Sequence, residues 1–482
     1  MTSLRRRDAL LKYTLPVLGL LIAYACATSI VSGDRTRLIL LLGLFSAPPL
    51  LYVTLRWPLV FPFGLYAAFV PIDNILSISG GSTITKLVGI AAGGALLLRA
   101  LILRRVLAPG SAWTAWTIVV VWMATTTLWS VNQPESLKVL GTVLSLWATY
   151  TITVTYPVER RELLVLAGVV VAVGVFLGFY AFYNYLHGQF AADDRLALGN
   201  GDYDIDPNHF AANFMLPVSV ATMGFLAIRR RLVRLVLAAS VSVMGLGILL
   251  TGSRGGLSAF AVLMIYVGIR TRRVREIGIV IAAALVSAIA FPLSFERFTD
   301  PTQGAASGRF YIWEVARPAL LEQMRWIYGN GIGGFPTVYN RSLRLVYQHV
   351  LTGYDRPGHN LIVQSSVELG VIGLILVLVA WYRSFRSASI VPAGTPLFAL
   401  RVASEGLALA LFTTAMTIDI LWFKYLWLAL SIGPLVRNVY APRRLFAKRS
   451  RGGDAPASAS FTVVPTLDRS AATSSSSLAS FE

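Results

Sequence analysis

Long apolar stretches separated by short polar segments dominate the chain. Many of them approach the ~20 residues that a helix needs to cross the hydrocarbon core of a bilayer. A membrane β-barrel would show segments of ~10 residues with alternating polarity instead. The stretch at 57–72 is short and broken by prolines, which favours a re-entrant segment. The pattern predicts spanning helices at 13–33, 38–55, 57–72, 87–105, 113–130, 137–156, 162–186, 209–228, 232–251, 255–269, 277–295, 359–381, 397–418 and 420–437.

These stretches predict an all-α, polytopic membrane protein with 12–14 transmembrane helices and one long outer loop that carries amphipathic helices. The first apolar stretch follows a run of arginines and lacks a convincing cleavage site, so we expect an uncleaved first helix. A tail rich in serine, alanine and threonine is typical of a disordered segment. The predicted organisation is N-terminal helices over 1–200, a region over 200–375 that includes the loop 296–358, C-terminal helices over 376–446, and a tail over 447–482.

Composition and charge support this class. The chain has 482 residues, of which 56% are hydrophobic and 13% charged, whereas soluble domains carry about 25% charged residues. With the N-terminus inside, arginine clusters such as Arg229-Arg230-Arg231 fall on the inner side, and the C-terminus is also cytoplasmic. This excess of basic residues on the inner side explains the net charge of +19, so that no binding of nucleic acid is needed to account for it. Membrane lipids are the partners that basic loops at this surface would contact.

Cysteine and histidine are too sparse for a metal site or a disulfide. Cys26 is the single cysteine, and it lies in the first apolar stretch. The four histidines show no paired spacing of the kind that binds zinc. We therefore expect neither a metal nor another cofactor.

The strongest candidate for chemistry is His359, at the start of an apolar run on the predicted outer side. A neutral imidazole at a membrane surface can accept a proton from a hydroxyl group. Gln364 and Glu368 follow on the same predicted helix, displaced in angle from His359; Gln364 is a weaker candidate for contact with a substrate. A histidine that caps the helix or lies at the interface would fit the same pattern.

Basic residues on the outer side oppose the general charge bias and are candidates for binding phosphate. Arg254 lies in Thr251-Gly252-Ser253-Arg254-Gly255-Gly256, where glycines permit a tight turn and the next helix offers its N-terminal N–H groups to an anion. Arg309 opens an amphipathic stretch that extends to about residue 327, with Phe310, Trp313, Ala316, Leu320 and Met324 as the apolar stripe. Lys86 is a weaker candidate. Interfacial anchoring would equally explain Arg254 and Arg309.

Asp206-Pro207-Asn208 is typical of a helix start, because Asp or Asn caps free N–H groups and proline fits the first turn. A contact of Asp206 or Asn208 with substrate is the alternative. The preceding loop contains four further aspartates, which could bind sugar hydroxyls or simply be solvated; these are Asp193, Asp194, Asp202 and Asp204. Arg401 and Glu405 are spaced four apart within a span and are expected to pair.

Taken together, these motifs resemble the superfamily of O-antigen ligases and O-antigen polymerases. The resemblance is strongest over 200–375. The matching stretches, in the same order, are Asp206-Pro207-Asn208, Thr251–Gly256, Ser307-Gly308-Arg309 with Trp313, Tyr328-Gly329-Asn330-Gly331-Ile332-Gly333, and Gly358-His359-Asn360 leading to Glu368-Leu369-Gly370.

The resemblance implies a metal-independent, inverting glycosyltransferase of the bacterial inner membrane, with its active site facing the periplasm. Its donor would be a glycan on undecaprenyl diphosphate, and its acceptor a glycan or the lipid A core of lipopolysaccharide. His359 would be the base on the acceptor hydroxyl, and Arg254 and Arg309 would bind the diphosphate.

Three functions remain open from the sequence. A ligase would join the glycan to lipid A core, whereas a polymerase would join repeat units to each other. A transporter of the same lipid-linked glycan, from another class of protein, would place charges at mid-membrane and show internal repeats. The notable charges here cluster at the outer face and no clear repeat is visible, which favours chemistry at the surface.

Overall fold

The fold is known from a computed structural model. It describes residues 35–73, 75–78, 82–189, 196–198, 206–278, 281–282, 309–321, 324–346 and 357–442. Several predictions lie outside these residues: the first span at 13–33, most of the span at 277–295, the first part of the outer loop, the four-aspartate cluster and the tail at 447–482.

The described chain is helical, which confirms the all-α class. Its strands are two residues each, Ser77–Ile78 (β1) and Ser82–Thr83 (β2), paired antiparallel with Ser77 opposite Thr83. The longer helices are α2 (Arg35–Arg56), α4 (Ile84–Ile102), α5 (Ser111–Thr126), α6 (Gln133–Thr155), α7 (Arg160–Leu186), α9 (Met215–Ala227), α10 (Arg231–Leu250), α11 (Arg254–Thr271), α17 (Phe335–Val346), α18 (Leu361–Phe385), α19 (Phe398–Ala415) and α20 (Lys424–Tyr440). The short ones are α3 (Phe63–Phe69), η1 (Val70–Ile72), η2 (Thr127–Trp129), α8 (Pro207–Asn213), α14 (Arg309–Ala316), α15 (Pro318–Leu321) and α16 (Arg325–Tyr328).

Within the described residues, seven helices are long and apolar enough to cross a membrane; α8 and α9 count as one span, Pro207–Ala227. The proline-broken stretch at 57–72 forms only the short α3 and η1, as its composition predicts. These spans make the protein a polytopic membrane protein.

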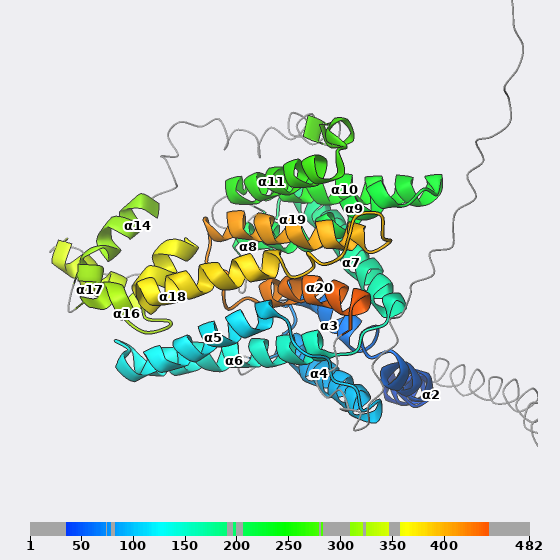
Figure 1. Cartoon of the computed structure of the whole chain (residues 1–482), viewed down its shortest axis with the longest axis horizontal. Coiled ribbons are helices and arrows are strands. Elements are labelled where there is room, and N and C mark those ends of the chain that lie inside the picture. Colours follow the sequence, from blue (N-terminus) through cyan, green and yellow to red (C-terminus); the bar gives the residue numbers. More distant parts are fainter. Residues whose placement is uncertain are drawn as a thin grey trace, which may run out of the picture. The chain divides into compact units, whose positions relative to one another are not determined.

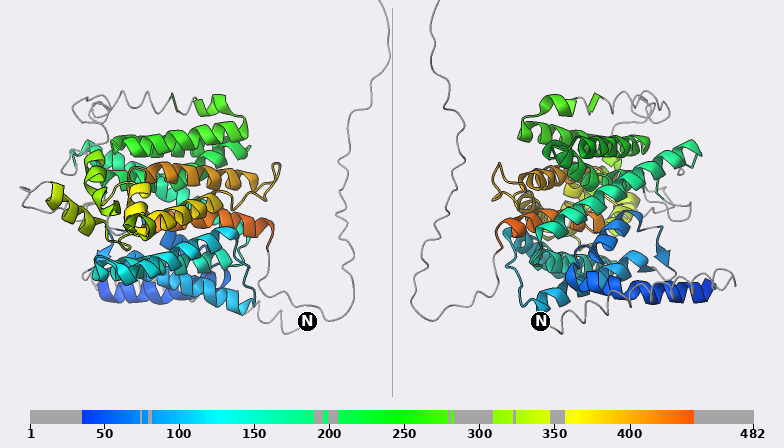
Figure 2. Two further views of the ribbon diagram at one scale, coloured as in Figure 1. Left: turned by 60° about the vertical axis from the view of Figure 1, so that its left-hand side comes forward. Right: turned by 90° about the vertical axis from the view of Figure 1, so that its right-hand side faces the viewer.

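Helix α18 lies in the middle of the bundle and packs against α5 and α19, and α11 in turn packs against α19 (Figures 1 and 2). The main core consists of leucine, valine, alanine and aromatic side chains from most of these helices. A second, smaller core joins α14, α15 and α17 to the first turns of α18. Figure 1 shows α14, α16 and α17 beside the end of α18 where this helix begins.

A break in α18 is filled by a glycine-rich segment from the outer loop. Gly370 adopts φ +70° inside the helix, which interrupts the backbone ladder. The N–H groups of Asn330 and Gly331 donate to the carbonyl oxygens of Val367 and Glu368, each at 2.9 Å. Gly329 also has positive φ (+80°), and its α-carbon leaves no room for a β-carbon against the Glu368 carbonyl. Two motifs of the sequence thus interlock and fix the first half of α18.

The amphipathic stretch from 309 to 327 differs from the single helix that its periodicity predicts. It forms three short helices, α14, α15 and α16. Pro318 disfavours helical geometry at the residue before it, and Met324 adopts φ +59°. Phe310 and Met324 of the predicted stripe are exposed, as side chains that face lipid would be, so the interfacial position stays a prediction. The face buried in the second core consists of Ile312, Val315, Ala316 and Ala319, which pack against α17.

The predicted pair of Arg401 and Glu405 is confirmed. Arg401 Nε lies 2.8 Å from Glu405 Oε1, and both side chains are buried in α19. Tyr266 of α11 donates its hydroxyl to Glu405 Oε2 at 2.6 Å. Both carboxylate oxygens of Glu405 thus have partners, and Arg401 also donates to the Val391 carbonyl oxygen at 2.6 Å. We infer that the pair joins α19 to α11 as a structural contact.

Candidate functional site

His359 lies in a tight turn immediately before α18. Its backbone φ is +47°, in the left-handed region that few residues other than glycine adopt, and its side chain is half-buried. Asn360 is the N-cap of α18, and its Oδ1 accepts from the N–H groups of Ile362 (2.9 Å) and Val363 (3.1 Å). The cap belongs to Asn360, so His359 itself is not the capping residue. Strained backbone of this kind persists only where surrounding contacts hold it.

Those contacts come from three directions. Gly358 donates its N–H to Gln364 Oε1 at 2.6 Å, and its carbonyl oxygen accepts from Trp313 Nε1 at 2.9 Å. Asn360 Nδ2 donates to the carbonyl oxygen of Met416, in the turn after α19, at 3.0 Å. Gln364 is itself buried and donates to Glu368. In this arrangement Gln364 holds the backbone beside His359.

The segment around Arg254 is joined to the Asp206-Pro207-Asn208 segment by side-chain hydrogen bonds. Ser253 caps α11 by accepting from the N–H of Gly256 at 3.0 Å, and it donates to Asn208 Oδ1 at 2.7 Å. Asp206 caps α8 by accepting from the N–H of Asn208 at 2.7 Å. Asn208 and Ser253 are both buried. Asp206 and Asn208 therefore have the capping role that the sequence indicates, and Asn208 also positions the start of α11.

The residues directly after Arg254 and His359 contact one turn of the chain. Arg254 is the first residue of α11. Its neighbour Gly255 approaches Thr417 so closely that no β-carbon would fit there. Met416, the residue before Thr417, accepts the hydrogen bond from Asn360. The starts of α11 and α18 are thus fixed against consecutive residues of the same turn.

His209 is a second histidine beside His359, and the sequence did not single it out. Its Nδ1 lies 3.0 Å from the Tyr425 hydroxyl, and its ring stacks on Phe423 with centroids 4.0 Å apart. His209 interacts electrostatically with both His359 and Asp206. The one signal in the sequence was its place, directly after Asp-Pro-Asn and just ahead of an apolar run.

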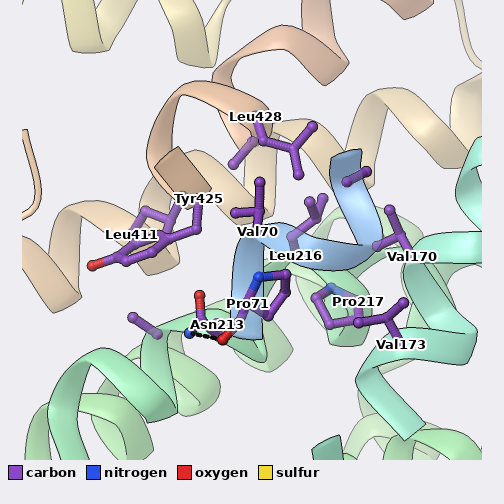
Figure 3. A pocket seen from close by; sticks show the side chains of 13 residues that line it. Val70, Pro71, Val170, Val173, Asn213, Leu216, Pro217, Leu411, Tyr425 and Leu428 are labelled. Carbon is purple, nitrogen blue, oxygen red and sulfur yellow. Dashed lines mark hydrogen bonds between the residues drawn. The ribbon is translucent and has the colours of Figure 1, made fainter. Parts of the chain in front are cut away.

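A small apolar pocket lies behind Tyr425, between α8, α9, α20 and η1 (Figure 3). Its lining includes Val70, Leu216 and Leu428. Asn213 of α8 donates to the carbonyl oxygen of Pro71 at 3.2 Å across one side of it. An apolar lining does not suit a diphosphate or a sugar, so this pocket belongs to the packing that supports the histidine side of the site.

Two buried carboxyl groups follow the contacts of the His359 turn along the chain, Glu368 in α18 and Asp419 after the 416–417 turn. Glu368 Oε1 accepts from the N–H of Phe335 at 3.2 Å, at the start of α17. Asp419, in the segment between α19 and α20, is also buried. Burial raises the pKa of Asp419 well above its usual range, and the neighbouring Glu368 raises it further. The sequence gives no sign that these two carboxyl groups meet, because they are 51 positions apart.

Arg309 and Lys86 lie further along the same end of the bundle. Arg309 begins α14, one turn before Trp313, whose ring nitrogen reaches Gly358. Lys86 is exposed in the first turn of α4. Thr83 caps that helix and also accepts from Lys424 Nζ at 3.2 Å.

Lys424 is a cation that the sequence analysis did not identify. It pairs with Asp73 at 2.5 Å and directly follows Phe423, which stacks on His209. Lys424 therefore lies in the chain between two residues, Phe423 and Tyr425, that both contact His209.

The assembled site offers groups for proton transfer and for binding an anion. The constrained turn of the His359 imidazole and the N-terminus of α11, which carries a guanidinium and N–H groups, are held against the same 416–417 turn. Among the described residues, no three His, Cys, Asp or Glu side chains are grouped as metal ligands would be. Independence from metal stays a prediction.

Comparison with known families matches residues 239–378 to the family described as O-antigen ligase. The matched region contains Arg254, Arg309 and His359, whereas His209 lies before it. Comparison with curated proteins gives no match.

Proposed function

We propose that this chain, a membrane protein of the O-antigen ligase superfamily, transfers a glycan from undecaprenyl diphosphate to a hydroxyl of an acceptor sugar. The acceptor that we propose is the lipid A core, as in the ligase reaction. The family makes the chain a glycosyltransferase-like membrane enzyme of the O-antigen ligase or polymerase type. The donor, the acceptor, the inner membrane and the periplasmic face belong to the proposal.

The observation that carries the proposal is that Gly255 and Asn360, the residues directly after Arg254 and His359, contact consecutive residues of one turn, Thr417 and Met416. A base alone could not release a diphosphate, and an anion site alone could not activate a hydroxyl. Here a histidine turn held by hydrogen bonds from α14, α18 and the 416–417 turn lies next to a helix N-terminus that bears an arginine. Positioning of reactants and cations in this way supplies much of the catalysis that phosphate leaving groups require.

In the proposed mechanism His359 takes the proton of the acceptor hydroxyl as its oxygen attacks the anomeric carbon. The bond from that carbon to the diphosphate oxygen breaks, and the electron pair leaves with the diphosphate. Arg254 and Arg309 stabilise the charge that develops on this leaving group. Attack from the side opposite the diphosphate inverts the anomeric centre. No metal is needed where fixed cations neutralise that charge.

Side-chain roles follow from exposure and contacts. We assign the base to His359 because its turn is fixed by three separate hydrogen bonds and its ring is half-buried at the end of the bundle. His209 is bonded through Nδ1 to Tyr425 and stacked on Phe423. We therefore assign His209 a positioning role, as a polar neighbour of His359. Lys424 is a further cation that could bind the diphosphate of the donor.

The test uses the full chain, purified into lipid nanodiscs, with a glycan on undecaprenyl diphosphate as donor. Separate reactions contain lipid A core or a second lipid-linked repeat unit as acceptor. Glycan joined to lipid A core supports the ligase proposal, and elongation of the repeat unit alone replaces it with the polymerase. No transfer to either acceptor by folded protein contradicts both, and movement of the donor between leaflets would then identify a transporter.

The arginine assignment has its own matched test. Arg254→Gln is compared with Arg273→Gln, which removes an arginine beyond the opposite end of α11. We expect Arg254→Gln to slow transfer at least tenfold, since a charge-assisted hydrogen bond to a phosphate contributes about 1.5–3 kcal/mol. Equal rates for the two variants would remove Arg254 from the diphosphate site.

A further inference from the structure

A polar pocket opens at the end of the bundle opposite to His359. It lies between the residues before α5, the residues after α18 and the last turns of α20. Since α18 has 25 residues and a helix rises about 1.5 Å per residue, the two ends are roughly 37 Å apart. The pocket is therefore separate from the candidate site and does not depend on the proposed function.

Two arginines and several serines line this pocket. Arg386 follows α18 and is exposed, and Arg437 in α20 is half-buried. Ser387 and Ser389 contribute hydroxyl groups from the turn after α18. None of the described residues that line the pocket is acidic. Its cavity volume of about 300 Å³ lies at the lower end of the range of roughly 300–1,000 Å³ that is common for small-ligand sites.

The beginning of α5 adds the N–H groups of a helix N-terminus to the same pocket. Gly110 is the N-cap of α5 and supplies no side-chain cap, and Ser111 and Ala112 also line the pocket. The first N–H groups of a helix have no partner within the helix, and the helix dipole makes this end positive. Gly110 lies against the guanidinium of Arg437, so that a β-carbon at this position would displace the arginine side chain. That close approach puts the arginine against the helix terminus, although the two positive groups repel each other.

The pocket is built from elements that are firmly tied together. Trp116 of α5 donates its ring N–H to Ser384 of α18 at 2.8 Å, and its ring packs against Trp427 of α20 with centroids 5.4 Å apart. The hydroxyl of Ser387 donates to the Ser384 carbonyl oxygen at 2.6 Å. The three helices that border the pocket are thus joined by direct contacts.

We propose that this pocket binds a phosphate group. Two guanidinium groups, the Ser389 hydroxyl and the first N–H groups of α5, in a cavity whose described lining has no carboxylate, are complementary to a phosphate dianion or diester. The pocket lies at the end of spanning helices, where the phosphate of an anionic phospholipid headgroup is the nearest source. Inorganic phosphate is the other source of the same chemistry.

The experiment measures binding to the full chain in nanodiscs of phosphatidylcholine. Phosphatidylglycerol is added in one series and inorganic phosphate in another, and bound ligand is counted by native mass spectrometry. Arg386→Gln tests the pocket. Arg383→Gln is the matched control, because Arg383 is exposed at the same end of α18 but does not line the pocket.

We expect saturable binding of ligand to the unmodified protein. Arg386→Gln should lower the affinity about tenfold or more, whereas the affinity of Arg383→Gln should equal that of the unmodified protein. Saturation by phosphatidylglycerol identifies a lipid headgroup site, and saturation by inorganic phosphate alone identifies a soluble ligand; both support the phosphate pocket. Equal losses in the two variants would contradict the proposal, because a general attraction of anions to surface charge explains them. Binding of neither ligand to the unmodified protein would contradict it as well.

Discussion

The hydrogen bond from Trp313 to Gly358 should affect the rate of transfer more than the stability of the fold. It joins α14 to the residue before His359, with 2.9 Å between Trp313 Nε1 and the carbonyl oxygen. Trp313→Phe removes this bond while keeping an aromatic ring in place. A hydrogen bond of this kind contributes about 1 kcal/mol. If all of it holds His359 in its reactive position, transfer slows about five-fold.

A second tryptophan in the chain provides the control. Trp381, in the second half of α18, donates its ring N–H to the carbonyl oxygen of Ala408 in α19, also at 2.9 Å. Trp381 is almost completely buried, whereas Trp313 is half-buried. Trp381→Phe should therefore lower the unfolding temperature at least as much as Trp313→Phe does, yet leave the rate near that of the unmodified protein.

The assay is the initial rate of glycan transfer at saturating donor and acceptor, with thermal unfolding recorded on the same preparations. The reasoning predicts a slower rate in Trp313→Phe and an unchanged rate in Trp381→Phe. Two variants that slow transfer equally, in proportion to their loss of stability, would show that the bond to Gly358 has no special part in positioning His359.

Three further predictions concern stability. Gly329→Ala combines positive φ with a clash against the backbone of α18, so we expect little folded protein by size-exclusion chromatography. The control is Gly188→Ala, which has positive φ but open space and should fold with a loss of only about 1–2 kcal/mol. Similar yields of folded protein from the two variants would contradict the proposed contact between Gly329 and α18. Glu405→Gln leaves buried Arg401 without its charge partner and should cost about 3–5 kcal/mol in unfolding experiments, whereas a change below about 1 kcal/mol would refute the pair's role. The raised pKa of Asp419 favours the protonated form in the folded state, so its contribution to stability is lost as pH rises through that pKa. Asp419→Asn should therefore be more stable than the unmodified protein at high pH and show a flatter pH profile; parallel profiles would contradict it.

Hydropathy predicted much of the fold because spanning helices are specified by local composition. The stretches at 162–186 and 232–251 correspond to α7 and α10 within a few residues. The stretch from 309 to 327 was harder, since its periodicity suggested one helix and a single proline divides it. The side chains that this stretch buries in the second core are selected by packing against α17, which the periodicity alone does not predict.

The site was predicted in its parts but not in its connections. His359, Arg254 and Asn208 belong to motifs that are visible in the sequence, each near a helix start. The hydrogen bond from Ser253 to Asn208 and the shared turn at 416–417 depend on tertiary structure, and no local pattern encodes them. Asp419 was missed for the same reason, since it lies in an apolar run and meets Glu368 only in the folded chain.

The most direct test of the account is transfer by His359→Ala, with His187→Ala as the control. His187 is an exposed histidine at the end of α7, stacked on Tyr183. Single-turnover rates with lipid A core as acceptor are measured on folded protein of both variants. The account predicts that His359→Ala slows the transfer step about a hundredfold or more while donor binding persists, and that His187→Ala is unchanged. Transfer by His359→Ala at the rate of the unmodified enzyme would contradict the assignment of His359 as the base.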